Sequence, residues 1–331
     1  LYIAEKLSVS GENIMFTSNY TSKNDLKKAL DINCIINLDD LSLVHDLNEV
    51  SSQFPKLISF RLNPGIGKTQ SETSSNILGG PEAKFGISPD NILDAYKYAK
   101  KYGAERFGIH MMTGSCILNN EYWKQSITIM IDIIKKIEKE LEIHFEFINI
   151  GGGLGIPYKP EELKININQL TEIIYQTFVE NKYLPQNLYM ENGRYITGPY
   201  GWLISKCHVI KESFGQTYYG LDSCMANLMR PGMYGAYHHI SVPEKKKEKH
   251  YANIVGTLCE NNDWFAKNRL ISKAKVGDIF IIHDTGAHSH SMGFQYNGKL
   301  RAPEVLFTKN NQLKLIRRRE NYSDYTNSIV F

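Results

Sequence analysis

The sequence predicts an α/β fold in which a partial β/α barrel is followed by a mostly β domain. Up to about residue 200, short β-rich runs alternate with helical stretches, the pattern of parallel strands joined by crossover helices. Beyond that point the alternation stops, and strand-like runs separated by turns take over. A length of 331 residues also favours two domains over one. We therefore expect a barrel domain over residues 1–200 and a β domain over residues 201–331.

Six strands are expected in the first domain. Each is a short β-rich run that ends in a polar or glycine cluster. In a β/α barrel such clusters lie at the carboxyl ends of the strands, where active sites are built. A closed barrel has eight strands, so we expect two more strands upstream of residue 1. The six runs cover residues 14–19, 34–39, 57–63, 106–111, 145–150 and 188–191.

Helical periodicity is clearest over residues 121–141, where apolar side chains recur every three or four residues. The pattern of residues 1–7 predicts an amphipathic helix. Neither a helix cap nor a signal-peptide pattern precedes it, so we expect the chain to begin inside a larger protein. In the second domain, strands are expected over residues 201–211, 252–259 and 278–284. The face of the long helix consists of Ile127, Met130, Ile131, Ile134, Ile137 and Leu141.

The composition indicates an ordinary soluble globular protein. Lys and Arg number 38 against 35 Asp and Glu, and a net charge of +3 creates no global attraction to nucleic acid or anionic membranes. No run approaches the roughly 20 apolar residues that a membrane span needs. The five cysteines form no C-x-x-C pair, which favours a reducing compartment. We expect a cytoplasmic protein with no nucleic-acid or membrane partner.

The histidines do not predict a metal site. His283, His288 and His290 are close in sequence, but no acidic or thiol residue lies at a familiar metal-binding spacing from them. His110 by itself is more typical of a packed histidine than of a catalytic one. We therefore expect no metal ion.

Two polar segments are candidates for catalysis, and the residues alone leave their roles open. Gly151, Gly152 and Gly153 follow a strand, so their backbone either approaches an anion closely or makes a turn with positive φ. Glu191 and Arg194 place a carboxylate and a guanidinium at one strand end. They could bind a cofactor and an anionic ligand, or form a surface ion pair.

In their order along the chain, these segments resemble the fold-type III pyridoxal-phosphate-dependent amino-acid decarboxylases, most closely the diaminopimelate decarboxylase branch. Several motifs in one order are far more specific than any motif alone. The resemblance implies a (β/α)8 barrel of the alanine racemase-like type, with its first two strands missing, plus a C-terminal mostly β domain. The motifs are residues 84–87, 108–115, 151–153, 191–194, 230–234, 259–263, 284–288 and 291–298.

The resemblance also implies a function, the decarboxylation of meso-2,6-diaminopimelate to L-lysine and carbon dioxide with pyridoxal 5'-phosphate as cofactor. Within the same family, the alternative is a relative that acts on ornithine, arginine or carboxynorspermidine. An alternative of another class is a non-catalytic binding protein that keeps this fold.

The resemblance implies a cofactor site built from several segments. The glycines 151–153, together with Gly193, would cradle the phosphate, and Arg194 would also belong to this site. Glu191 would bond the pyridine nitrogen and keep the ring an effective electron sink. His110 would lie against the ring face as a catalytic residue.

By the same resemblance, Arg194, Arg230 and Tyr234 would grip a carboxylate of the small amino-acid substrate. Cys259 would be the proton donor and Glu260 would read the distal ammonium, both reaching into the active site of a partner subunit. Shared sites imply a homodimer.

Lys84 and Asp263 would pair across that dimer interface. Cys259 considered alone is more typical of a buried thiol at a strand end. Its neighbour Glu260 and the order of the motifs favour the catalytic role.

Three departures from the family pattern are visible. His288 stands where most relatives carry a phosphate-binding tyrosine, and an imidazole can also donate a hydrogen bond. Asn192 replaces a usual proline, which should alter rigidity more than chemistry. The lysine that forms the Schiff base in this family lies in a Lys-Ala-Asn context, which does not occur in this sequence. Lys27 and Lys28 cannot replace it, because they lie in a helical stretch. We therefore expect little or no activity from this chain alone.

Overall fold

The structure is a computed structural model that describes residues 1–69, 78–243 and 248–330. These residues form two compact units, which we describe separately. Unit 1 comprises the described residues up to 155 together with 164–192, and unit 2 comprises 156–163 and the described residues from 193 onward.

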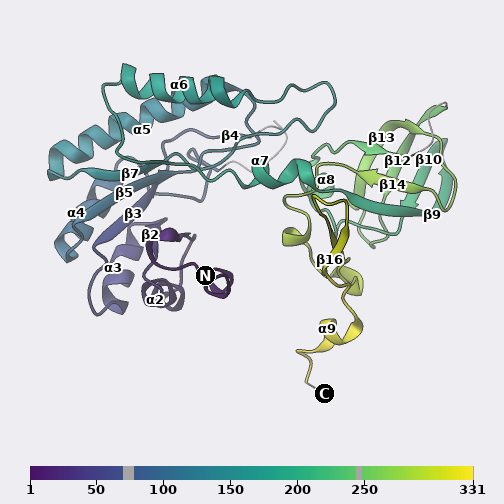
Figure 1. Ribbon diagram of the computed structural model, residues 1–331, viewed down its shortest axis with the longest axis horizontal. Coiled ribbons are helices and arrows are strands. Elements are labelled where there is room, and N and C mark those ends of the chain that lie inside the picture. The colour runs from purple at the N-terminus through teal and green to yellow at the C-terminus, as the bar shows by residue number, and fades with distance from the viewer. Residues whose placement is uncertain (70–77, 244–247, 331) are drawn as a thin grey trace. The chain divides into compact units, whose positions relative to one another are not determined.

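Unit 1 is built on a parallel sheet of six strands in the order β1-β2-β3-β5-β7-β8 (Figure 1). Each of the six predicted runs contains one of these strands, with the ends shifted by at most two residues, so this part of the fold prediction is confirmed. The strands are β1 (Met15–Thr17), β2 (Ile35–Leu38), β3 (Leu57–Leu62), β5 (Arg106–Met111), β7 (Phe145–Asn149) and β8 (Leu188–Tyr189), and the short pair β4 (Lys68–Thr69) and β6 (Gly114–Ser115) lies beside them.

The sheet is strongly curled. Four strand spacings separate β1 from β7, which would place them roughly 19 Å apart in a flat sheet. The Asn149 side-chain amide on β7 nevertheless lies 3.1 Å from the Met15 sulfur on β1. Inward-facing Ile35, Leu57 and Phe147 form a small apolar cluster with Met15. The sheet therefore encloses a partial barrel interior, as the predicted fold class requires.

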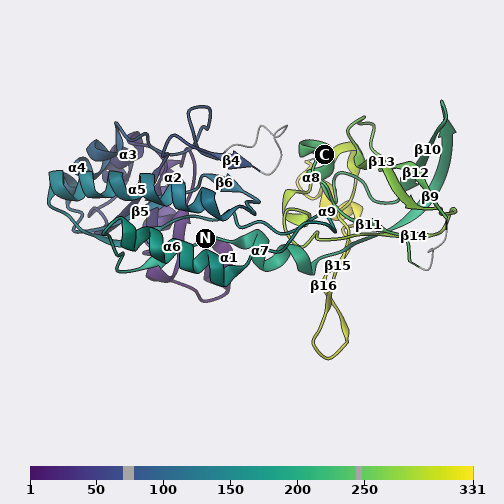
Figure 2. The ribbon, with the colours of Figure 1, turned by 90° about the horizontal axis from the view of Figure 1, so that it is seen from above.

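Helices cover the outer face of this sheet, and α4, α5 and α6 lie side by side there (Figure 2). In α5, the predicted apolar face is buried except at Leu141, which is only half-buried. The first helix forms as predicted, but none of its residues is buried. The helices of unit 1 are α1 (Tyr2–Lys6), α2 (Lys23–Asp31), α3 (Ser42–Val50), α4 (Ile92–Tyr102), α5 (Asn120–Leu141) and α6 (Ile167–Glu180), with a 3-10 turn at Gly11–Asn13.

Unit 2 contains a mostly antiparallel sheet in the order β11-β14-β9-β10-β12-β13, in which only β10 and β12 pair in parallel. Tyr219, Phe265 and Phe280 are buried in its core. The sequence predicted β9, β12 and β14 but missed the others. The strands are β9 (Leu203–Ser213), β10 (Gln216–Leu221), β11 (Ile240–Ser241), β12 (Lys249–Val255), β13 (Trp264–Ser272) and β14 (Ile279–Ile282).

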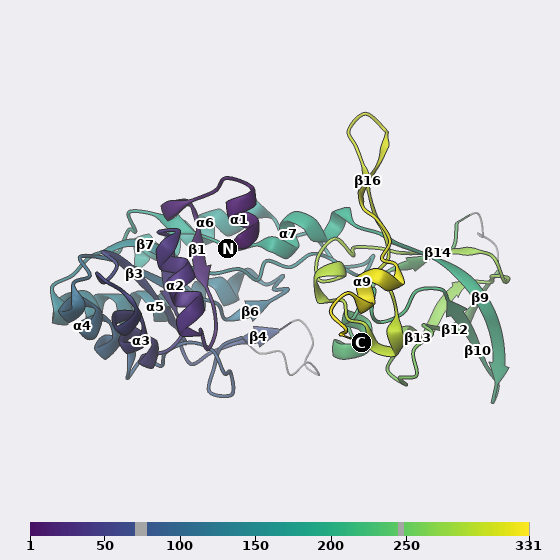
Figure 3. The same ribbon diagram turned by 90° about the horizontal axis from the view of Figure 1, so that it is seen from below.

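The remaining elements of unit 2 are short. A hairpin of β15 (Glu304–Phe307) and β16 (Leu313–Arg317) projects away from the sheet (Figure 3). Across the described ranges of both units, no helix is long and apolar enough to cross a membrane. The helices of unit 2 are α7 (Gly193–Thr197), α8 (Arg230–Tyr234) and α9 (Tyr322–Thr326), and its 3-10 turns are Gly198–Tyr200, His290–Met292 and Tyr296–Gly298.

Candidate active site

Polar side chains gather at the carboxyl ends of the unit 1 strands, although most of the sheet is apolar. Asp39 follows β2, Arg61 lies on β3, His110 on β5 and Asn149 at the end of β7, and all four are at most 6% exposed. Buried charged and polar groups are costly unless they are paired, so such a concentration indicates a functional site. Parallel pairing places Arg61 beside His110 and His110 beside Asn149.

Glu191 is the carboxylate that this cluster holds. The Asn149 amide donates to Glu191 Oε1 at 2.8 Å, and His110 Nε2 lies 3.3 Å from Glu191 Oε2. Partial burial alone would raise the pKa of Glu191. The hydrogen bonds from His110 and Asn149 and the charge of Arg61 outweigh it, and the net effect lowers the pKa. The side chain is still 38% exposed, so an ionised carboxylate faces outward from the cluster.

His110 combines near-complete burial with an unpartnered atom. Its side chain is 1% exposed, and within the described residues Nδ1 has no hydrogen-bond partner. Buried polar atoms of this kind are rare in folded proteins and indicate a missing ligand or water. The residues therefore fit a polar cofactor beside Glu191.

Arg61 and Asp39 complete the cluster, and sequence reasoning did not identify either of them. Their side chains are 3.6 Å apart from Nη1 to Oδ1, and Arg61 also donates to Asn19 and lies over the Phe85 ring. Burial raises the pKa of Asp39, although Arg61 and the Gly86 amide oppose that shift. The signal that the sequence carried was a charged residue inside the apolar run of β3 and another directly after β2.

The glycines 151–153 form a turn that requires glycine for two reasons. Gly151 has φ +70°, and a Cβ there would lie 2.1 Å from the Met111 carbonyl oxygen. A Cβ on Gly152 would lie 2.1 Å from the carbonyl oxygen of Glu191. The turn interpretation is therefore supported by the positive φ of Gly151 and Gly153, whereas the approach of this backbone to an anion stays a prediction.

Two asparagines fasten this turn. Asn149 Oδ1 accepts from the Gly151 amide at 2.9 Å, while the same side chain donates to Glu191. Asn192 Oδ1 accepts from the Leu154 amide at 3.2 Å, a bond that the usual proline could not form. The substitution at position 192 thus adds a specific contact and does not only alter rigidity.

Glu191 and Arg194 do not share a strand end, contrary to prediction. Strand β8 stops at Tyr189, and Arg194 lies on α7 in unit 2, because Gly193 begins a helical turn. A Cβ on Gly193 would meet nothing within 4 Å, so close approach does not explain this glycine.

In unit 2, two arginines gather around Tyr158. Arg194 Nη1 donates to the Tyr158 hydroxyl at 3.0 Å, and the Arg230 guanidinium lies 4.4 Å from the centre of the same ring. Burial, followed by the charges of Arg194 and Arg230, lowers the pKa of His288 to about 4. His238 packs edge-on against Tyr158 and bonds Arg230. Sequence reasoning missed Tyr158 and His238, and the cluster suits an anionic ligand.

The remaining predicted substrate residues lie elsewhere in unit 2. Tyr234 ends the helix that Arg230 begins. Cys259 and Glu260 are exposed in the loop after β12, where the Cys259 amide donates to Asn297 Oδ1 at 2.8 Å. The interpretation of Cys259 as a buried thiol is therefore wrong, because β12 ends four residues earlier, at Val255.

The two predicted interface residues have partners within their own units. Asp263 is 4% exposed and accepts from the amides of Met225 and Leu258. Lys84 lies over the rings of Tyr20 and Phe85. Their pairing between subunits stays a prediction.

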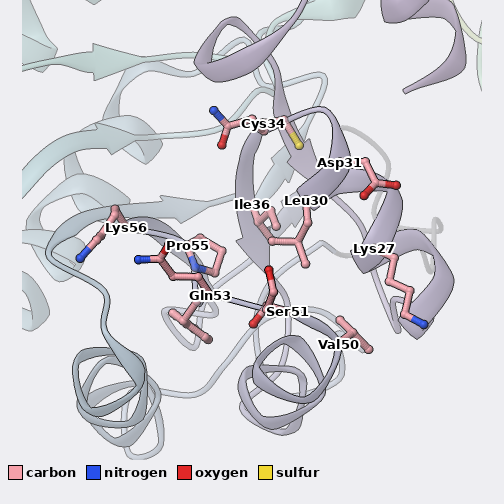
Figure 4. Close-up of a pocket in the computed structure, with 13 residues that line it drawn as sticks. Lys27, Leu30, Asp31, Cys34, Ile36, Val50, Ser51, Gln53, Pro55 and Lys56 are labelled. Atoms are coloured by element: carbon pink, nitrogen blue, oxygen red, sulfur yellow. The ribbon is translucent and has the colours of Figure 1, made fainter.

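A cavity of about 370 Å³ lies at the opposite end of the unit 1 strands, between α2 and the segment that leads into β3 (Figure 4). Among the described residues that line it, the charged ones are Lys27, Asp31 and Lys56. Cys34 also lines it, but its thiol donates to the Ala29 carbonyl, and burial raises its pKa to about 11. The cavity thus lies apart from the polar cluster at the carboxyl ends of the strands.

No group of three or more His, Cys, Asp or Glu side chains that could hold a metal ion occurs within residues 1–69, 78–243 and 248–330.

Comparison with known proteins identifies the family. The family described as "Pyridoxal-dependent decarboxylase, pyridoxal binding domain" matches residues 1–198. Protein TabA of Pseudomonas amygdali pv. tabaci is 38% identical over 99% of this chain and 77% of its own length. Diaminopimelate decarboxylase of Methanothermobacter thermautotrophicus is 35% identical over 98% of this chain and 76% of its own length.

Solved structures agree with this assignment. Diaminopimelate decarboxylase of Methanocaldococcus jannaschii in complex with L-lysine superposes with a TM-score of 0.89 and 32% identity. The match covers 99% of this chain and 77% of that one. The partial barrel, the β-rich second unit and these matches together show that this chain belongs to the pyridoxal-dependent decarboxylase family of fold type III.

Proposed function

We propose that this protein converts meso-2,6-diaminopimelate to L-lysine and carbon dioxide with pyridoxal 5'-phosphate as cofactor. The observation that carries the proposal is the ionised, partly exposed Glu191 carboxylate. Asn149 donates a hydrogen bond to this carboxylate and accepts one from the Gly151 amide of the glycine turn. Relatives that are 30–35% identical over most of this chain bear the name diaminopimelate decarboxylase, and one of their structures contains L-lysine.

Unit 1 supplies the residues that would hold the cofactor. When bound, pyridoxal phosphate supplies an electron sink for the carbanion left by loss of carbon dioxide. Glu191, kept ionised, would hold a proton on the ring nitrogen, and His110 would lie against the ring. The glycine turn of residues 151–153 would cradle the phosphate, and Gly193 and His288 of unit 2 would be further proposed contacts.

Unit 2 supplies the residues that would recognise the substrate. Arg194, Arg230 and Tyr234 would bind a carboxylate, which suits a substrate with two carboxylates. Arginine fits this task because its planar N–H groups match the two carboxylate oxygens. In this proposal the barrel domain of residues 1–200 makes most of the cofactor contacts, and the β domain of residues 201–331 supplies Arg230 and Tyr234 for substrate recognition.

The assembly that we propose is a cytoplasmic homodimer. Cys259 and Glu260 are exposed, so they can reach a second subunit, where the thiol would donate a proton and the carboxylate would read the distal ammonium. All five cysteines are free thiols, which suits a reducing compartment. Lys84 and Asp263 would contribute to the interface.

The test is an assay of carbon dioxide release by protein expressed from its native reading frame and supplied with pyridoxal phosphate. We expect a higher kcat/KM for meso-2,6-diaminopimelate than for ornithine, arginine or carboxynorspermidine. A preference for one of those amines would contradict the substrate assignment. Binding of the cofactor without turnover of any of them would favour the non-catalytic alternative.

A further inference from the structure

His238 has a protonation pattern that its two partners determine. Its side chain is fully buried, with Nδ1 2.8 Å from the carbonyl oxygen of His283 and Nε2 2.6 Å from Arg230 Nη1. A carbonyl oxygen only accepts and a guanidinium only donates. The hydrogen must therefore be on Nδ1, and the lone pair of Nε2 must accept from Arg230.

This imidazole also stays neutral. Burial, and then the charge of Arg230, lower the pKa of His238 to about 3, with smaller contributions from Arg194 and Arg269. The carbonyl of His283 opposes the shift but does not reverse it. At neutral pH the residue is therefore an acceptor without charge, which can orient a guanidinium without adding a negative charge beside it. An aspartate or glutamate in the same place would add one.

The Arg230 side chain is held on two sides by these groups. His238 bonds one terminal nitrogen, and the face of the guanidinium lies over Tyr158, whose ring in turn meets the edge of His238. Arg230 itself is only 6% exposed. Such contacts restrict an otherwise flexible side chain, and restriction of this kind lets an arginine bind a carboxylate with little loss of conformational entropy.

We propose that His238 is a positioning residue that orients Arg230 toward a carboxylate of the substrate. The inference rests on the proposed function, because it takes Arg230 to bind that carboxylate. His238 does not contact the substrate in this proposal. Its role is to aim the N–H groups of Arg230.

L-lysine and cadaverine separate this role from a general effect on the site, because they differ only by the carboxylate. We would measure their inhibition constants against diaminopimelate decarboxylation in the holoenzyme. His238→Leu removes the acceptor, so L-lysine should bind about tenfold more weakly while cadaverine is unaffected. His238→Gln can both accept from Arg230 and donate to the His283 carbonyl, and should restore most of the lysine affinity.

His239→Leu is the matched control, because it makes the same change one residue along the chain without touching Arg230. It should leave both inhibition constants unchanged. Equal weakening of L-lysine and cadaverine by His238→Leu, or no effect on either, would overturn the inference. If the wild-type protein itself does not prefer L-lysine to cadaverine, the proposed role of Arg230 fails first, which is a separate outcome.

A second measurement does not depend on whether the leucine variant folds. Nitrogen-15 NMR of the imidazoles in the wild-type holoenzyme should show His238 with its hydrogen on Nδ1 and a bare Nε2 from pH 7 to pH 5. A hydrogen on Nε2 would overturn the proposal, because that atom could not then accept from Arg230.

Discussion

The two units hold their functional groups in opposite ways. In unit 1, an amide, an imidazole and a guanidinium surround one carboxylate and keep it ionised. In unit 2, burial and the charges of Arg194 and Arg230 lower the pKa values of His238 and His288, so both histidines stay neutral. One unit thus presents an anion, which suits the protonated nitrogen of a ring, and the other presents cations, which suit a carboxylate.

The difference lies in which group is exposed. Glu191 remains 38% exposed while its partners His110 and Asn149 are buried, so the charged group is accessible and the buried groups hold it in place. In unit 2, buried His238 hydrogen-bonds Arg230, and the ring of buried Tyr158 packs against its guanidinium. In both places a buried polar side chain fixes the direction of a charged one, a role that a list of charged residues alone would not reveal.

The largest effect should come from removing the anion of unit 1. Glu191→Gln keeps the shape but not the charge, so kcat for diaminopimelate should fall about 10²–10³-fold in steady-state assays. Glu146→Gln is the control, because Glu146 pairs with exposed Arg106 away from this cluster. An unchanged kcat in Glu191→Gln would show that the negative charge of Glu191 is not needed for the reaction.

The next effect tests the cations of unit 2. Arg230→Lys keeps the charge but loses the planar donor pair and the bond to His238, so KM should rise about 10–100-fold with little change in kcat. Arg317→Lys, at an exposed pair with Glu304, should behave as wild type. A large fall in kcat with KM unchanged would mean that Arg230 acts in the chemical step.

The pH dependence of stability should separate the two clusters. The pKa of His238 falls from 6.5 to about 3 on folding, so below pH 6.5 the unfolded chain binds a proton that the native chain does not. His238 should therefore contribute a fall of about 2 kcal/mol in the free energy of unfolding between pH 6.5 and pH 5, and the lowered pKa of His288 should add to it. Urea unfolding should show this loss reduced in His238→Gln.

Glu191→Gln provides the matched comparison for this window. Folding also lowers the pKa of the Glu191 carboxyl, from 4.5. The stabilising contribution of Glu191 is therefore present above pH 4.5 and is lost only below that pH. The variant should therefore keep the wild-type loss between pH 6.5 and pH 5. If Glu191→Gln removed the loss of stability between pH 6.5 and pH 5 and His238→Gln did not, the assignment of this pH range to His238 would be wrong.

The smallest effect concerns the fastening of the glycine turn. Asn192→Ala removes the acceptor of the Leu154 amide and should lower the free energy of unfolding by about 1 kcal/mol in urea titrations. Asn187→Ala removes an exposed bond to Glu146 and should cost less. An equal cost at both positions would show that Asn192 has no special place in the site.

Much of unit 1 could be predicted from the sequence, because parallel buried strands are continuous apolar runs with polar ends. The six runs and the long helix around Ile131 therefore appeared at nearly their observed limits. Unit 2 was predicted less well. Strand β13 alternates between buried and exposed positions only in part, and β10 pairs in parallel with a strand some thirty residues later, so local patterns were weak.

The candidate residues show the same division. Glu191 and the glycines 151–153 could be identified because their neighbours along the chain resemble a known family. Asn149, Tyr158 and His238 could not, because each acts through partners distant in sequence. The exposure of Cys259 could not be read from its neighbours alone, since it depends on where β12 ends.

The sequence by itself determined the six strands of the unit 1 sheet, its long helix, the change of architecture near residue 200 and the family. These follow from residue periodicity and from motifs, which are local properties of the chain. Only the tertiary structure decided the charge state of Glu191 and the tautomer of His238. Both depend on burial and on donors or acceptors contributed by separate strands and loops, and such surroundings exist only once the chain has folded.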